Sequence, residues 1–191
     1  MTAAARLLRA GAVLETALAR VAGAAAWLFL AAALVIGFDV VTRKFGYQVP
    51  GLGSTRLQEL QWHLHTALFA GWLGYAYVRN AHVRIDTLAA RAGARTRAWL
   101  ELAGCLLLAL PFCAVGLYFG IDYAWTAWLR NEASESMSGL PYRFVPKSLI
   151  ALAFLLLALG AAAVALRAAA LLLGARDDQG GFLPRAAPSP R

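Results

Sequence analysis

Polar side chains that could bind a ligand gather in one short stretch of an apolar sequence. Glu59 and His63 are four residues apart, as are Gln61 and His65, and Thr66 follows directly. On a helix, residues at this spacing share a side. Glu59, His63, Thr66 and Tyr77 fall near one line, and Gln58, Gln61, His65 and Trp72 fall near another roughly 120° away. These groups could ligate a metal or a haem, or they could hydrogen-bond neighbouring helices. The second interpretation needs only that two sides of this helix face protein.

The rest of the sequence lacks the further ligands that a metal or haem site would need. The three histidines are His63, His65 and His82, so no other apolar run supplies a facing ligand for a haem in a helical bundle. Cys105 and Cys113 are eight residues apart, too far for a bridge on one helix and unlike the spacing of a zinc site. We therefore predict no metal, no cofactor and no catalytic residue, and two packing cysteines. A cytochrome b-type membrane anchor stays as an alternative.

The elements that carry these residues are four apolar runs, at residues 21–38, 60–78, 98–119 and 148–166. Each approaches the roughly 20 helical residues that cross a hydrocarbon core of about 30 Å. The composition agrees, with 61% hydrophobic residues and a mean hydropathy of +0.61. The sequence predicts an all-α polytopic membrane protein, with a single four-helix domain over residues 21–173. It leaves no room for a catalytic domain, so we expect no enzyme.

Two segments flank this domain. In residues 1–20, Leu7, Leu14 and Leu18 fall on one side of a helical projection and arginines fall on the other. This pattern is typical of an amphipathic helix that lies in the headgroup plane, so we predict a cytoplasmic interfacial arm. Residues 174–191 are rich in Gly, Pro and charged residues, a composition that predicts a disordered tail.

The basic residues indicate the orientation. The net charge is +8, and with a cytoplasmic N-terminus ten of the Lys and Arg residues that flank the runs lie inside and six lie outside. The connection between the second and third runs holds five arginines, which is the strongest contribution to the bias. We therefore predict that the N- and C-termini are both cytoplasmic.

Three motifs in order along the chain resemble the small permease subunit of tripartite ATP-independent periplasmic (TRAP) transporters, the DctQ-like family. They are Glu59-Leu-Gln-Trp-His63, His82-Val-Arg-Ile-Asp86 and Leu140-Pro-Tyr-Arg-Phe-Val-Pro-Lys147. The resemblance covers residues 20–172, and its wording is most similar to the branch labelled mannitol/chloroaromatic.

The resemblance implies a noncatalytic subunit of the bacterial inner membrane. Its partners would be a large permease, which carries the transport site, and a periplasmic solute-binding protein, for sodium-coupled uptake of an organic acid or related solute. The resemblance assigns an inner membrane-surface motif to His82, Arg84 and Asp86. It assigns docking of the binding protein to charged residues of the last outer loop, which are Arg130, Glu132, Glu135, Arg143 and Lys147.

A third hypothesis is a self-sufficient exporter with four helices per subunit. Such a protein needs a carboxylate inside the membrane, and Glu101 is the inward candidate. The apolar runs contain neither a central acid nor a helix broken by Gly and Pro, which are the features that bind ions at the midplane. This absence favours a supporting subunit over a complete pathway.

Overall fold

The computed structural model describes residues 2–47, 49–82 and 92–175, and this part of the chain is helical with short connections. The helices are α1 (Ala3–Lys44), α2 (Ser54–Val78), α3 (Ala94–Gly104), α4 (Leu110–Leu129) and α5 (Phe144–Leu172). A π-helical turn, η2 (Cys105–Ala109), joins α3 to α4. The all-α prediction is confirmed. Of the inner motif, Arg84 and Asp86 lie outside the described residues, as does the tail from residue 176.

Within the described residues, three helices are long and apolar enough to cross a membrane: Ala3–Lys44, Ala94–Leu129 and Phe144–Leu172. The helix α2 has 25 residues, about 37 Å at 1.5 Å per residue, which is also long enough. It is less apolar than these three helices because its first half carries the polar stretch from Gln58 to Thr66. Its place as the fourth span therefore stays a prediction.

The predicted arm and the first span form one helix. The helix α1 runs for 42 residues without a break, and the Thr2 side chain caps its start by accepting from the Ala5 N–H at 3.3 Å. The side of the arm that carries Leu14 and Leu18 packs on protein, with Leu18 buried against Leu156 of α5. The amphipathic pattern thus serves helix packing. Whether the arm also lies in the headgroup plane stays a prediction.

The third predicted span, residues 98–119, contains a proline, Pro111. Pro111 lacks a backbone N–H, and it stands in the first turn of α4 directly after the π-helical turn. In that turn Leu110 N–H bonds to the Cys105 carbonyl, five residues back, so the helix continues through a widened turn. The two cysteines of this helix, Cys105 and Cys113, form no disulfide and are buried, as predicted for packing residues.

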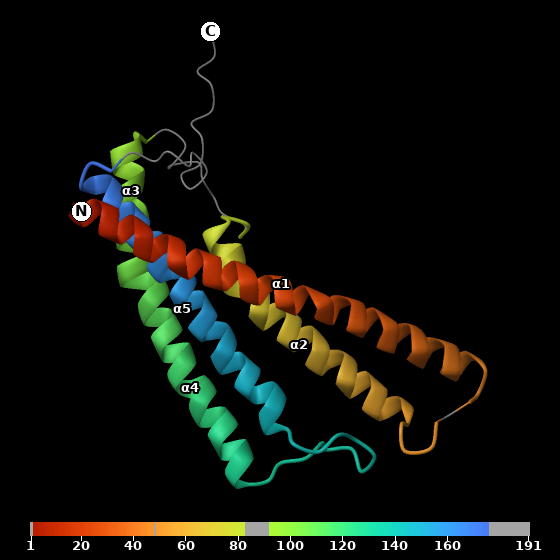
Figure 1. Ribbon diagram of the computed structural model, residues 1–191. Helices are drawn as coiled ribbons and strands as arrows, with labels where there is room; N and C mark the ends of the chain where they lie inside the picture. The colour runs from red at the N-terminus through yellow and green to blue at the C-terminus, as the bar shows by residue number, and fades with distance from the viewer. Residues whose placement is uncertain (1, 48, 83–91, 176–191) are drawn as a thin grey trace.

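The helices form an open layer. The helix α5 packs between α2 and α4, and α1 packs on α2 and on α5. Figure 1 shows the α1–α2 pair and the α4–α5 pair converging at the end that holds the N-terminus and α3. They diverge toward the opposite end, which the predicted orientation makes the periplasmic or outer end. The core therefore lies where the helices converge.

Close backbone contact holds that core together. A Cβ on Gly74 of α2 would lie 2.2 Å from the carbonyl oxygen of Leu156, and one on Gly160 of α5 would lie 2.6 Å from the Gly74 oxygen. Glycines at both positions let the two backbones touch, which is a common way to associate helices in lipid. On the inner side, Glu15 of α1 and Arg167 of α5 form an ion pair.

Candidate functional site

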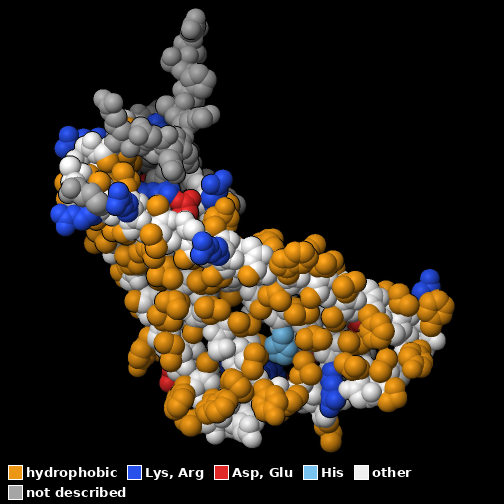
Figure 2. All heavy atoms as spheres, viewed as in Figure 1, with side chains coloured by type: hydrophobic (Ala, Val, Ile, Leu, Met, Phe, Trp, Pro, Cys, Tyr) orange, Lys and Arg blue, Asp and Glu red, His pale blue; other side chains and the backbone are white. Residues whose placement is uncertain are grey.

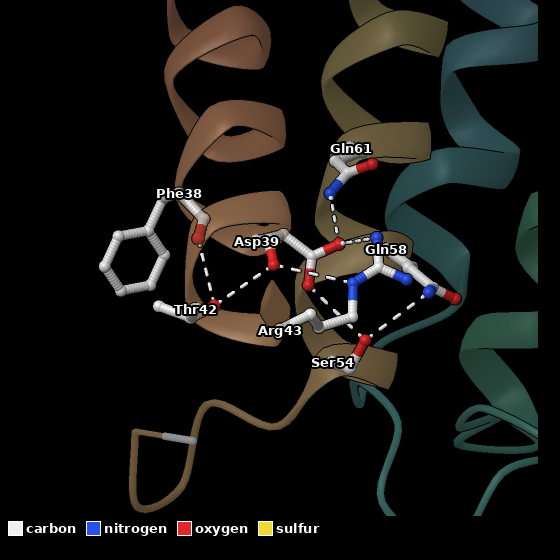
Figure 3. A network of polar contacts seen from close by, with 7 residues as sticks. All are labelled: Phe38, Asp39, Thr42, Arg43, Ser54, Gln58 and Gln61. Carbon is white, nitrogen blue, oxygen red and sulfur yellow. Dashed lines mark hydrogen bonds and ion pairs between the residues drawn. The ribbon is translucent and has the colours of Figure 1, made fainter. Parts of the chain in front are cut away.

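The outer end of the layer carries a buried carboxylate on α1. The Asp39 side chain is 1% exposed. It accepts hydrogen bonds from Ser54 Oγ at 3.3 Å and from Gln61 Nε2 at 3.2 Å, both on α2, and it pairs with Arg43 at 2.8 Å (Figure 3). A buried charge is costly unless it is paired and hydrogen-bonded, and here both conditions are met. This group, with Gln58 bonded to Ser54, is called the Asp39 network.

The Asp39 network joins the ends of two helices across a short loop. Gly46 and Gly51 adopt positive φ angles of 66° and 80°, which let the chain turn back between α1 and α2. Ser54 begins α2 and Gln61 lies two turns further along, so the carboxylate contacts α2 at two levels. The network therefore sets how α1 and α2 align at the outer end.

A second group fastens the last outer loop to α2. The Glu59 carboxylate accepts from the Leu140 N–H at 2.6 Å and from the Ser134 hydroxyl. Three residues before Glu59, in the preceding turn of α2, Arg56 donates to the Ser138 carbonyl at 3.1 Å. The loop that connects α4 to α5 thus reaches across the open end to α2, as Figure 1 shows. It bridges the two diverging pairs of helices.

The charge of Glu59 suits this role. Glu59 precedes the predicted span at residues 60–78, so it lies outside that span, at the end that the predicted orientation makes the outer one. Burial by itself raises its pKa, but the hydrogen bonds from Leu140 and Ser134 and the nearby Arg143 lower it, and the pKa lies below the usual value of 4.5. The carboxylate is therefore ionised at neutral pH, when it accepts both bonds.

The other polar residues of α2 make fewer contacts. Thr66 donates to the Trp62 carbonyl of its own helix at 2.8 Å. His63 is half-buried, His65 is exposed, and neither forms a hydrogen bond with another described residue. His82 stacks at a tilt near Tyr77, with 5.8 Å between ring centroids. The structure thus brings Glu59 and Gln61 to other segments, and it leaves His65 facing outward.

The charged residues of the outer loop divide into two groups. Lys147 pairs with Glu132 and lies over the Tyr123 ring, 3.9 Å from its centroid, so this cation and anion satisfy each other. Arg130 and Glu135 are exposed. Arg143 is half-buried, and its backbone N–H bonds to the Glu132 carbonyl at 2.9 Å.

Sequence reasoning missed two acids that join helices. Asp39 directly follows the apolar run at residues 21–38, and Glu15 lies within the predicted arm, so the sequence pattern assigned neither a role. A signal existed for Asp39: Arg43 follows four residues later, and amides and a serine lie at the start of the next helix. In the described residues, no group of three or more His, Cys, Asp or Glu side chains is placed to hold a metal ion.

Comparison with known proteins places these features in a family. Residues 32–171 match the family described as Tripartite ATP-independent periplasmic transporters, DctQ component. The chain belongs to the DctQ family. It is thus a small membrane component of a TRAP transporter, which is a transport system and no enzyme. The match spans α2, α3 and α4 entirely, α5 up to residue 171 and the later part of α1, and so includes the Asp39 network.

No curated protein and no solved structure matches the chain. DctQ components work in TRAP transporters beside a large permease and a solute-binding protein. The mannitol/chloroaromatic branch is neither supported nor contradicted, and it stays a prediction.

Proposed function

We propose that this DctQ subunit scaffolds the large permease of its TRAP transporter and helps dock the solute-binding protein on the outer side. The transporter would sit in the bacterial inner membrane with both termini of this chain cytoplasmic. It would import an organic acid or related solute with a sodium gradient, and the transport site would belong to the large permease.

The observation that carries the proposal is the outward face of α2. Trp62, His65 and Phe69 follow one another at helical spacing, and all three are exposed. His65 lies five residues inside the predicted span, about 7–8 Å from its outer end. A polar side chain at that depth is costly in lipid but is satisfied by a partner helix, and exposed tryptophan is a common centre of binding energy at interfaces.

The open layer supports the same proposal. Among the 18 most apolar consecutive residues of each long helix, 17% are buried in α1, 11% in Ala94–Leu129 and 33% in α5. Outside the places where they pack on one another, the helices therefore present broad faces to their surroundings. The visible face in Figure 2 is largely covered by hydrophobic side chains. Such a subunit can lie against a larger membrane protein without losing its own core.

Co-purification tests the scaffold. The adjacent large permease is expressed with wild-type protein or with Trp62→Ala, and the amount retained on the tagged small subunit is measured. We expect Trp62→Ala to weaken retention about 30-fold, the effect of losing about 2 kcal/mol at a hot spot. Trp125→Ala, an exposed tryptophan on α4, is the matched control. Equal retention by the two variants would contradict the α2 interface.

We assign docking of the binding protein to exposed charged residues of the loop between α4 and α5, residues 130–143, which is called the bridging loop. Because Glu132 and Lys147 are paired with each other, Arg130 and Glu135 are the side chains available to a partner in this loop. We expect charge reversal at Glu135 to lower uptake at low concentrations of binding protein and to leave retention of the large permease unchanged. Uptake by vesicles that contain only the small subunit would contradict the whole proposal.

A further inference from the structure

A groove opens between α4 and α5 at the outer end of the layer. Its volume is about 490 Å³, within the range of small-molecule sites. Two of its lining residues, Gly116 and Gly120, lie one turn apart on α4, and their lack of a side chain lets α5 approach closely. A Cβ on Gly116 would lie 2.5 Å from the Phe154 ring, and one on Gly120 would lie 3.1 Å from the Ala151 backbone. The floor of the groove is therefore shaped by close helix packing.

The polarity of the groove changes along its length. Gly116 and Phe154 line it within the predicted spans, where hydrocarbon surrounds the protein. Asp122, Tyr123 and Thr126 line it beyond residue 119, at headgroup level. From Gly116 to Thr126 the rise along α4 is about 15 Å, so the groove runs from the outer end of the predicted span into the headgroup layer. The groove thus offers an apolar wall and a polar rim within the depth of one leaflet.

The rim carries an uncompensated negative charge. The Asp122 side chain is exposed, and it makes no ion pair with any residue of the described segments. Lys147 lies over the ring of Tyr123, the residue that follows Asp122, but it is already paired with Glu132. A ligand that brings a positive charge to the rim and an apolar chain to the wall would complement both parts.

We propose that this groove binds one phospholipid whose headgroup carries a protonated amine. The ammonium group contacts Asp122, and an acyl chain lies against Phe154 and Ile150. A lipid fits better than a helix of a partner because a single amphiphile supplies tail and cation over the observed 490 Å³. The inference does not depend on the docking roles proposed above.

Lipid retention tests the proposal. The protein, alone and with its co-expressed large permease, is equilibrated with equimolar phosphatidylethanolamine and phosphatidylglycerol, and bound lipid is counted by native mass spectrometry. We expect the wild-type protein to retain one phosphatidylethanolamine in preference. Asp122→Asn should lower that preference about fivefold, as expected for one charge near a membrane surface. Glu135→Gln, an exposed acid outside the groove, is the control and should keep it.

A second variant tests the apolar part. Ile150→Trp fills the groove, so retention of either lipid should fall while the elution profile stays that of the wild type. Equal retention of the two lipids by the wild-type protein, or an unchanged preference in Asp122→Asn, would overturn the proposal. If the large permease displaces the lipid and Asp122→Asn weakens its co-purification, the groove is a protein contact and the lipid assignment is wrong.

Discussion

Single polar side chains link helices in this protein through hydrogen bonds and ion pairs, and Asp39 makes several of these contacts. Its carboxylate accepts from Ser54 and Gln61 and pairs with Arg43. Asp39→Ala should lower the free energy of unfolding by about 3 kcal/mol, because several polar groups lose a buried partner. Asp39→Asn, which keeps one acceptor, should lower it less. Arg20→Ala, at an exposed site on the same helix, should change it by less than about 0.5 kcal/mol.

Unfolding in mild detergent, followed by a folding-dependent label or by denaturant, measures these differences. Equal stability of the Asp39→Ala and Arg20→Ala variants would mean that water or lipid replaces the lost contacts, and that the Asp39 network does not align α1 with α2.

Glu59 holds the bridging loop against α2 by accepting hydrogen bonds from Leu140 and Ser134. Because its pKa is lowered in the folded state, the two hydrogen bonds are fully present above the usual value of 4.5 and are lost as the pH falls through the folded value. Hydrogen exchange should therefore show the Leu140 amide protected at neutral pH, with protection falling below about pH 4.5. Glu59→Ala should abolish the protection at any pH. Unchanged protection in that variant would contradict the bridge to α2.

At the scale of elements, α2 and α5 are held by backbone contact. Gly74→Ala places a Cβ 2.2 Å from a backbone oxygen of α5, which cannot move without shifting the whole helix. We expect a loss of about 3 kcal/mol of stability, the upper range for overpacked sites. Gly23→Ala and Gly37→Ala, on α1 with nothing within 4 Å, should be neutral or stabilising.

Thermal unfolding in one detergent compares the three glycine variants directly. The same measurement separates the two kinds of glycine in this chain, those that permit close approach and those that only lie in a helix. If Gly74→Ala unfolds at the temperature of the controls, the two helices have room to separate and the contact is not tight.

At the scale of the whole molecule, the arrangement predicts which surfaces face each compartment. Met137, at the tip of the bridging loop, is fully exposed at the end far from the N-terminus, whereas Cys105 and Cys113 are buried. In intact cells, Met137→Cys should react with a maleimide that cannot cross the inner membrane, and Ala4→Cys should react only after permeabilisation. The wild-type protein, with its two buried cysteines, should stay unlabelled. The reverse pattern would invert the predicted topology.

Much of the fold could be predicted because lipid imposes simple rules on a sequence. Apolar runs of about 20 residues must be helices in a membrane, and the second run is recognised at its end, Val78, where the structure also ends α2. The starts of helices were less predictable. The helix α1 begins at Ala3 and α2 at Ser54, because amphipathic turns outside the hydrocarbon continue each helix without an apolar signal.

The candidate site was only half predictable for a related reason. Helical spacing groups Glu59 with His63 and Gln61 with His65, but it does not say which neighbour each side meets. In the structure, Glu59 accepts a hydrogen bond from the bridging loop, Gln61 donates one to Asp39, and His65 is exposed. Each choice depends on the angles at which α1, α2 and α5 cross.

The sequence by itself determined the solvent, the helical class and the family of this protein, since length, hydropathy and ordered motifs are local properties of the chain. Only the tertiary structure decided that the helices form an open layer, that Asp39 is a buried link, and that a loop closes the outer end. These features follow from contacts between segments far apart in sequence, such as Glu59 with Leu140, and from glycines whose value appears only where two backbones meet.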